Sequence, residues 1–144
     1  TGDIQLSLAQ SVPVTGAVIV TTPQDVALLD AKRGIEMFRK VEVPIIGIVE
    51  NMSIHVCSNC GHSEHIFGEG GASSIAKSYD VDLLGELPLD VNIRAQCDAG
   101  VPAVVSDPDG KVTEIYLSIA SKVAEKLASP NSAQGKPTIS ISDD

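Results

Sequence analysis

Two short stretches of the chain are almost continuously apolar, residues 16–22 (GAVIVTT) and 43–53 (VPIIGIVENMS). Such runs, with almost no polar alternation, predict strands that are buried on both faces of a parallel sheet. The residues between them repeat with a helical period. One side of that helix is apolar and the other is charged: Leu28, Ala31, Ile35, Phe38 and Val41 against Lys32, Arg33, Glu36, Arg39 and Lys40. Residues 16–50 therefore predict a β-α-β unit with a right-handed crossover.

The rest of the chain supplies further elements in an alternating order. We expect helices at DIQLSLAQ (3–10), 72–79 and 111–128, a third strand at 82–90, and a helix that Asp90 caps and that stops before Gly100. Residues 102–105 (PAVV) predict a short extended piece, and residues 54–71 a loop. The helix at 111–128 carries an apolar stripe of Val112, Tyr116, Ile119, Ala120, Val123 and Leu127.

This order is α/β and resembles half of a doubly wound, mostly parallel sheet with helices on both faces. We expect one domain over residues 1–128 and a disordered polar tail over residues 129–144, which is rich in Ser, Pro and Gly. An incomplete sheet exposes an edge and apolar surface, so the isolated chain is predicted to aggregate.

Composition excludes several classes of partner. The net charge is −9 and the chain has only four aromatic residues, which argues against a nucleic-acid surface built on phosphate contacts and stacking. No apolar run approaches the roughly 20 residues that span a bilayer. Three cysteines are too few and odd in number for a secreted disulfide framework, so we expect a reducing cytoplasm.

The segment HVCSNCGH (55–62) holds two of the three cysteines, Cys57 and Cys60. A Cys-x-x-Cys pair on one small loop can bind zinc, bind an iron–sulfur cluster or act as a redox dithiol. The redox reading is disfavoured, because thioredoxin-like pairs sit where a strand feeds directly into a helix, and here a long loop follows. Two reduced cysteines in a loop are the simplest alternative, although the polar surroundings favour binding.

One chain supplies only half of a four-cysteine site. Cys97 lies on a predicted helix and is expected to be a buried small residue. His55, His62 and His65 are spaced too compactly for a usual zinc finger and are each more typical of a solvent-facing loop. Symmetry offers the remaining route, because two copies that each give Cys57 and Cys60 would build the site on a twofold axis.

Three other features suggest a ligand less strongly. GEGG (68–71) follows no strand directly and precedes no Lys-Ser/Thr, so it fails as a phosphate loop. Asn51 ends a buried strand, where α/β sheets bind ligands, but it is equally typical of a turn. Pro88 closes the strand at 82–87.

Together, TGDIQLSLAQ, GAVIVTTPQDVALLDAKRGIEMF, VPIIGIVENMS, CSNCGH, IFGEGG and LLGELPLDVNIRAQCDAGVP closely resemble the Mrp/ApbC family of iron–sulfur cluster carrier ATPases. This is a P-loop group related to MinD and the nitrogenase iron protein, and the resemblance covers about residues 1–128. It implies a cytoplasmic homodimer that binds ATP with Mg²⁺, holds a [4Fe–4S] cluster between two Cys-x-x-Cys pairs and delivers it to apoproteins, without nucleic acid or membrane as partner.

The resemblance also implies roles for single residues. Cys57 and Cys60 match the cluster ligands, Asn51 matches the Asn that contacts adenine, and Pro88 matches the segment on the other side of the base. Asp3 matches the stretch just after the acidic switch II turn, and Val91 stands where the family usually has Pro.

The family's phosphate-cradling loop and acidic switch residue are absent from these 144 residues. Without them little would stabilise a transferring phosphoryl group, so this chain alone is expected not to hydrolyse ATP. Two other functions remain open at this stage. One is a zinc-stabilised dimerisation module, and the other is a MinD/ParA-like positioning ATPase.

Overall fold

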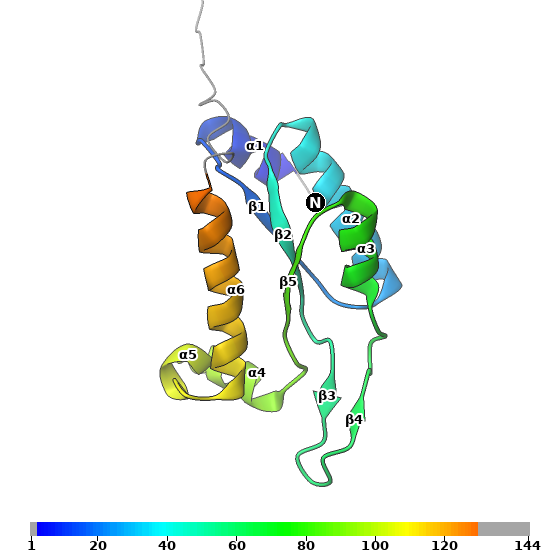
Figure 1. Cartoon of the computed structure of the whole chain (residues 1–144), viewed down its shortest axis with the longest axis vertical. Coiled ribbons are helices and arrows are strands. Elements are labelled where there is room, and N and C mark those ends of the chain that lie inside the picture. Colours follow the sequence, from blue (N-terminus) through cyan, green and yellow to red (C-terminus); the bar gives the residue numbers. More distant parts are fainter. Residues whose placement is uncertain (1–2, 130–144) are drawn as a thin grey trace, which may run out of the picture.

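A computed structural model describes residues 3–129 of the chain. Its centre is a parallel sheet of three strands in the order β1-β2-β5, as Figure 1 shows. These strands are β1 (Ala17–Thr21), β2 (Ile45–Glu50) and β5 (Leu83–Glu86). The predicted β-α-β unit and the third strand are confirmed. The disordered tail expected at 129–144 lies, beyond Ser129, outside the described residues.

Helices cover both faces of the sheet. On one face α2 (Asp25–Lys40) and α3 (Gly71–Tyr79) enclose a core of Ile19, Ala31, Ile35, Ile48, Ala72, Ile75 and Ala76. On the other face α6 (Lys111–Ala128) packs on β5 and β2 over Val49, Leu84 and Leu87. Successive residues of a strand point to opposite faces, so Ile48 and Val49 of β2 serve the two different cores.

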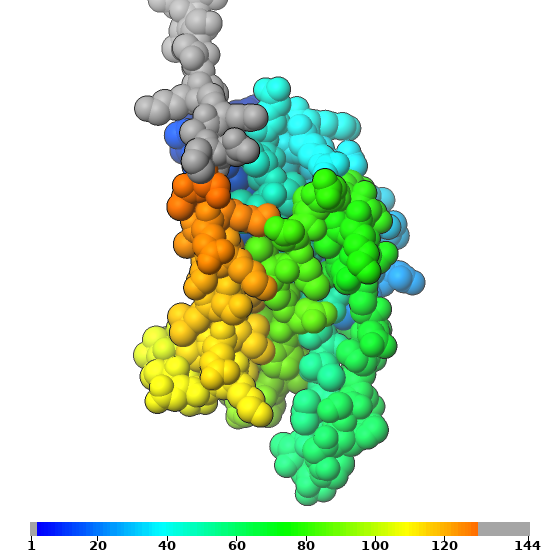
Figure 2. Space-filling view, viewed as in Figure 1, coloured from blue at the N-terminus to red at the C-terminus, as the bar shows by residue number. Residues whose placement is uncertain are grey.

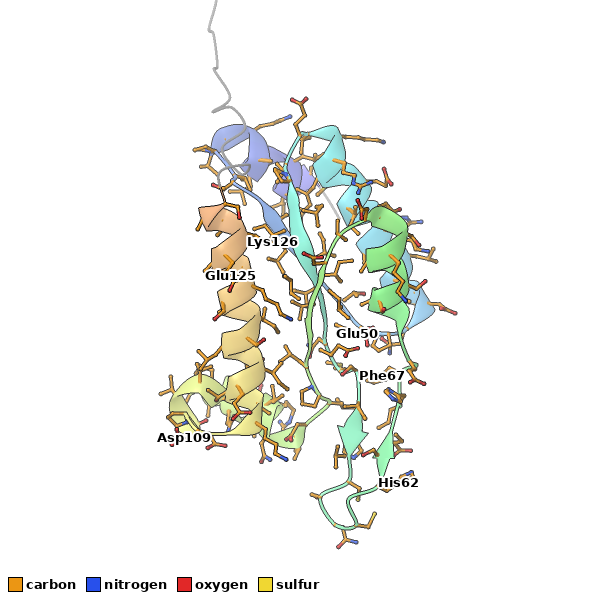
Figure 3. The ribbon with its side chains drawn as sticks, in the orientation of Figure 1. Glu50, His62, Phe67, Asp109, Glu125 and Lys126 are labelled. Carbon is orange, nitrogen blue, oxygen red and sulfur yellow. The ribbon has the colours of Figure 1, made fainter. Side chains whose placement is uncertain are left out.

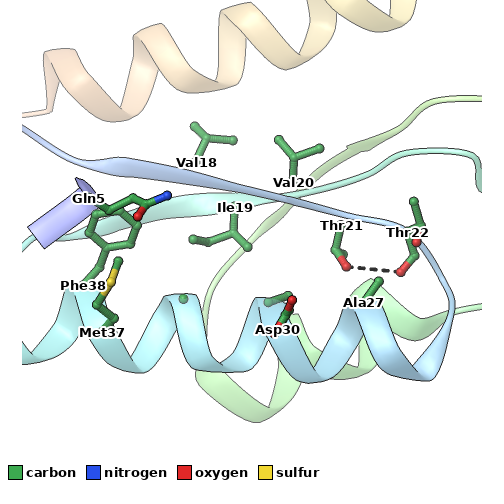
Figure 4. Close-up of a pocket in the computed structure, with 12 residues that line it drawn as sticks. Gln5, Val18, Ile19, Val20, Thr21, Thr22, Ala27, Asp30, Met37 and Phe38 are labelled. Atoms are coloured by element: carbon green, nitrogen blue, oxygen red, sulfur yellow. Dashed lines mark hydrogen bonds between the residues drawn. The ribbon is translucent and has the colours of Figure 1, made fainter. Parts of the chain in front are cut away.

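The strand β1 departs from the expectation of burial on both faces. Ile19 is buried against α2, whereas Val18 and Val20 are 36% and 63% exposed. The reason is that α6 contacts β5 and β2, and β1 lies at the edge of the sheet beyond its reach. In Figure 4, Val18 and Val20 project from the side of the strand opposite α2.

The two edges of the sheet differ in their protection. At β5, Lys122 of α6 donates a hydrogen bond to the Leu84 carbonyl oxygen at 2.7 Å, and Lys126 pairs with Asp82 just before the strand. At β1, a pocket of about 450 Å³ runs along the strand beside α2, with Gln5 at its wall (Figure 4). Lysine side chains are a common device for guarding an edge strand, and the edge at β1 has none in its pocket lining.

The short helices lie on either side of this centre. They are α1 (Asp3–Ser11), α4 (Val91–Asp98) and α5 (Ala103–Ser106). The prediction for α4 is confirmed in detail, because the Asp90 carboxylate accepts a 2.7 Å hydrogen bond from the Asn92 amide. The extended piece expected at 102–105 is wrong: Pro102 starts a helical turn in which Val105, Ser106 and Asp107 bond back to residues 102 and 103.

The apolar stripe predicted on α6 is correct for its central part. Tyr116, Ile119 and Val123 pack on the sheet, together with Ile115, which the stripe omits. Leu127 and Ala120 are exposed. Within residues 3–129, no helix has the length and apolar character that a bilayer crossing demands.

Candidate functional site

Cys57 and Cys60 lie in the turn between two short strands, β3 (His55–Val56) and β4 (Ser63–Glu64), which pair antiparallel. These strands form a hairpin that projects from the body of the molecule, as Figures 1 and 2 show. This hairpin replaces the plain loop expected at 54–71. A period of two over so few residues is too short to show in the sequence.

The turn of the hairpin is closed by backbone hydrogen bonds around the first cysteine. The Gly61 amide donates to the Cys57 carbonyl oxygen at 2.8 Å, and the Cys57 amide donates to the His62 carbonyl oxygen at 2.9 Å. Gly61 has a φ of +72°, which is left-handed backbone that glycine adopts without strain. Cys-x-x-Cys-Gly is thus a local turn that brings both thiols to one tip.

The surroundings of Cys57 favour its thiolate. Hydrogen bonds hold the pKa of the Cys57 thiol below its usual value. The largest effect comes from the backbone amide of Cys60, followed by the Asn59 amide and the Cys60 thiol. Both cysteines are reduced, with Cys57 half-buried and Cys60 exposed. Because thiolates are the metal-binding form of cysteine, the lowered pKa of Cys57 favours metal binding at the tip, where the two thiols form a clip.

The clip has no third protein ligand among the described residues. No group of three or more His, Cys, Asp or Glu side chains in residues 3–129 could hold a metal ion. Cys97 is exposed on α4, so its expected burial is wrong. The helix α4 buries none of its residues, which leaves a small side chain there open to solvent.

Two of the three histidines are hydrogen-bonded rather than free in a loop. Nδ1 of His55 lies 3.0 Å from the Leu89 carbonyl oxygen, and Nδ1 of His65 lies 2.9 Å from the Ser53 carbonyl oxygen. A carbonyl only accepts, so Nδ1 carries the proton in both rings. His62 is exposed near the tip, as expected (Figure 3).

Asn51 directly follows β2, at the carboxyl edge of the sheet. Its Oδ1 accepts a 3.0 Å hydrogen bond from the Met52 amide, and Met52 has a φ of +59°. The turn role that the sequence allowed is therefore present. It leaves the Asn51 side-chain amide group, a donor, without a described hydrogen bond at an edge where α/β proteins bind ligands.

Pro88 lies next to this turn, in a ladder that continues the β2–β5 pairing. Leu87 donates to the Glu50 carbonyl oxygen at 2.8 Å, and Leu89 donates to the Ile54 carbonyl oxygen at 2.8 Å. Alternate residues bond in such a ladder, so Pro88 occupies a position whose missing N–H is not needed. The structure thus brings Asn51 and Pro88 to the same edge, beside the base of the cysteine hairpin.

The glycine-rich segment GEGG leads into α3, where a backbone amide of the first turn is hydrogen-bonded to a buried side chain, Glu50. Glu50, which is 1% exposed, accepts a 2.8 Å hydrogen bond from the Ala72 amide (Figure 3). Helix N-termini attract anions, and here the protein's own carboxylate fills that role because Gly70 offers no capping side chain. A phosphate at this helix end would have to compete with Glu50 for the Ala72 amide, which fits the expectation that GEGG is not a phosphate loop.

Sequence reasoning missed Glu50 and the two histidine contacts. Glu50 stands in an otherwise apolar strand, and a carboxylate in such a place signals a buried partner. The histidine contacts have no comparable signal, because their carbonyl partners come from distant residues.

Comparison with solved structures places the fold among P-loop NTPases. A nucleotide-binding protein in complex with ADP from Archaeoglobus fulgidus is 34% identical with a TM-score of 0.65, over 78% of this chain and 45% of that one. The septum site-determining protein MinD complexed with Mg-ADP from Pyrococcus horikoshii is 27% identical with a TM-score of 0.61, over 83% and 44%. The predicted class of fold is confirmed.

The family follows from the sequence comparison. Residues 1–124 match the model described as ParA, NUBPL iron-transfer P-loop NTPase, and the chain belongs to this family. An iron-sulfur cluster carrier protein of Escherichia coli is 61% identical over 127 residues, which are 88% of this chain and 34% of the relative. The iron-sulfur cluster transfer protein NUBPL of mouse is 52% identical over 129 residues, or 90% and 40%. The chain therefore spans between about a third and two fifths of the length of these curated relatives.

Proposed function

We propose that residues 1–128 form the C-terminal half of a P-loop ATPase domain that carries an iron–sulfur cluster. Cys57 and Cys60 hold one side of a [4Fe–4S] cluster, and the same two cysteines of a second copy hold the other side. The cluster is then transferred to apo iron–sulfur proteins. The observation that carries this proposal is the pair of free thiols at the tip of a projecting hairpin, with no third ligand within the described residues.

The geometry of the clip supports a shared, transferable cluster. A [4Fe–4S] cluster needs four thiolates and one chain offers two close together, so a twofold axis through the tip completes the set. The exposed tip also lets an acceptor protein reach the cluster without unfolding the carrier. The lowered pKa of the Cys57 thiol makes its metal-binding thiolate form easier to reach than in a free cysteine, which favours rebinding.

The nucleotide is ATP with Mg²⁺, and this chain supplies the adenine side of its pocket through Asn51 and Pro88. The complexes of the two structural relatives with ADP and with Mg-ADP support this assignment. The 144 residues contain no glycine-rich loop ending in Lys-Ser or Lys-Thr, so hydrolysis needs phosphate-binding groups from outside this sequence. The intact ATPase that carries this chain is the species that hydrolyses ATP.

Nucleotide and cluster act on each other through the dimer. Nucleotide bound at the carboxyl edge changes the relative placement of two subunits, and with it the four-thiolate site between them. The protein works in the cytoplasm, where reducing conditions keep its thiols free, and needs neither nucleic acid nor a membrane.

Anaerobic reconstitution of the intact ATPase with iron and sulfide tests the proposal. We expect the broad charge-transfer absorbance of a cluster at about four iron atoms per dimer. Cys57→Ala and Cys60→Ala should each abolish it, while Cys97→Ala is the matched control and should keep it. Zinc bound to fresh protein with no cluster formed would contradict the proposal and favour a zinc-stabilised dimerisation module.

A further inference from the structure

The cysteine hairpin stands on two legs that are held in different ways. The outgoing leg, residues 51–56, is fixed to the segment 87–89 by backbone hydrogen bonds: Ser53 donates to the Leu87 carbonyl oxygen and Leu89 donates to the Ile54 carbonyl oxygen, at 3.0 and 2.8 Å. This leg therefore moves with the edge that carries Asn51 and Pro88.

The return leg, residues 63–71, has no such backbone ladder below the two pairs of the hairpin. One side-chain contact ties it to the outgoing leg instead: His65 donates from Nδ1 to the Ser53 carbonyl oxygen at 2.9 Å. Just beyond the ends of the two legs, the Glu50 carboxylate accepts a hydrogen bond from the Ala72 amide at 2.8 Å and joins the base of the loop.

The Ser53 peptide joins the His65 contact to the bonds that fix the outgoing leg to Leu87. Its amide and its hydroxyl both donate to the Leu87 carbonyl oxygen, at 3.0 and 3.2 Å, and its own carbonyl oxygen accepts from His65. Ser53 is 5% exposed and lies two residues after Asn51. A shift of the turn at Asn51 therefore reaches the return leg through the His65 ring.

We infer that His65 is a positioning residue that couples nucleotide at the Asn51–Pro88 edge to the cluster at the hairpin tip, by bonding the return leg to the Ser53 peptide. This inference rests on the proposed function. His65 lies five residues from Cys60 and its side chain is 37% exposed, so its substitution leaves the core intact. It contacts neither the cluster clip nor the nucleotide edge by its own side chain.

The test uses two amide variants of the intact ATPase that differ in one methylene. In His65→Asn the amide nitrogen occupies the position of Nδ1 and keeps the bond to Ser53. In His65→Gln the amide lies near the position of Nε2, and the bond is lost. His62→Ala is the control, because the His62 ring is exposed near the tip and makes no hydrogen bond within the described residues.

The measurement is the rate at which a chelator removes iron from the reconstituted cluster, with and without Mg-ATP. We expect nucleotide to change this rate by about fivefold or more in the wild type, a typical lower bound for coupling between sites. His65→Asn and His62→Ala should keep the change. His65→Gln should reduce it to less than about twofold while cluster content and ATP affinity stay at wild-type values.

The outcomes separate the two claims. A nucleotide effect that persists in His65→Gln at wild-type size overturns the role of His65 and leaves the proposed function standing. Loss of the effect in His65→Asn as well as His65→Gln overturns it too, because a restored hydrogen bond should restore coupling. If the wild type forms no cluster, the proposed function fails, and the inference fails with it.

Discussion

The carboxylate of Glu50, the last residue of β2, accepts a hydrogen bond from the backbone amide of Ala72 in the first turn of α3, at 2.8 Å. Twenty-one residues separate the two, and the whole cysteine hairpin lies between them. The contact therefore fixes where the loop leaves the sheet and where it returns. It also satisfies one of the amides that every helix leaves unpaired at its N-terminus.

Substitution of Glu50 tests this contact through the free energy of unfolding. Glu50→Ala removes the acceptor from a buried amide and should lower that free energy by about 1–3 kcal/mol. Glu50→Gln keeps an oxygen at nearly the same place and should cost clearly less. Urea unfolding of the two variants provides the measurement, and an equal loss in both would show that the hydrogen bond is not the stabilising feature.

The parts of the fold that the sequence predicted depend on long local patterns. The periodicity of residues 25–40 and the Asp90 cap are each encoded within one element, and each was predicted correctly. The exposure of Val18 and Val20 was not predictable in this way. It depends on how far α6 reaches across the sheet, which is a property of the assembled layers.

In the candidate site, too, local features could be predicted from the sequence and tertiary contacts could not. Cys57 and Cys60 form a local pattern, so their proximity could be predicted from spacing. The contact of His65 with Ser53 spans 12 residues, and that of His55 with Leu89 spans 34. Contacts of this kind depend on tertiary placement, and residue type alone does not predict them.

Asn51 provides a prediction that separates its two roles. Its Oδ1 stabilises the turn by accepting from the Met52 amide, while its amide group is available to a ligand. Asn51→Asp keeps the oxygen and removes the donor, so stability should hold within about 0.5 kcal/mol. The affinity of the intact ATPase for ATP should fall about tenfold, the value of one good hydrogen bond.

Calorimetric titration with ATP and urea unfolding check this pair of effects. Asn51→Ala loses both groups and should reduce stability as well as affinity. Unchanged ATP affinity in Asn51→Asp, with a loss of stability in Asn51→Ala, would show that Asn51 serves the turn alone.

Substitution by alanine is expected to have opposite effects on stability at two glycines, Gly34 and Gly85. A Cβ at Gly34, inside α2, meets nothing closer than the Ile19 Cδ1 at 4.0 Å. Gly34→Ala should therefore raise the free energy of unfolding by roughly 0.5–1 kcal/mol, because alanine favours a helix interior. A Cβ at Gly85 would lie 2.6 Å from the Ile119 Cγ1, under α6, so Gly85→Ala should lower it by about 1–3 kcal/mol.

Thermal or urea unfolding of the two alanine variants under one condition gives the comparison. A loss of stability in Gly34→Ala would mean that α2 is packed more tightly against the sheet than the distance to Ile19 indicates. An unchanged stability in Gly85→Ala would mean that α6 can shift away from β5 at little cost.

The lowered pKa of the Cys57 thiol leads to a prediction about how its reactivity depends on pH. Amides of Cys60 and Asn59 stabilise its thiolate, which holds its pKa in the folded protein below that of the unfolded chain. The thiolate, and with it alkylation by iodoacetamide, should therefore develop at lower pH in the folded protein. Because the pKa of Cys57 is lower in the folded protein, ionisation of this thiol stabilises the fold. This stabilisation is fully present above the pKa of the unfolded chain and is lost as pH falls through the pKa of the folded protein.

The double variant Cys60→Ser, Cys97→Ser isolates this thiol, since the chain has three cysteines, and it retains the backbone amides that cause the shift. Its alkylation rate is measured against pH in buffer and again in urea, where the same thiol is unfolded and serves as its own reference. The midpoint in buffer should lie below the midpoint in urea. Coincident midpoints would mean that the turn does not direct its amides at the sulfur of Cys57.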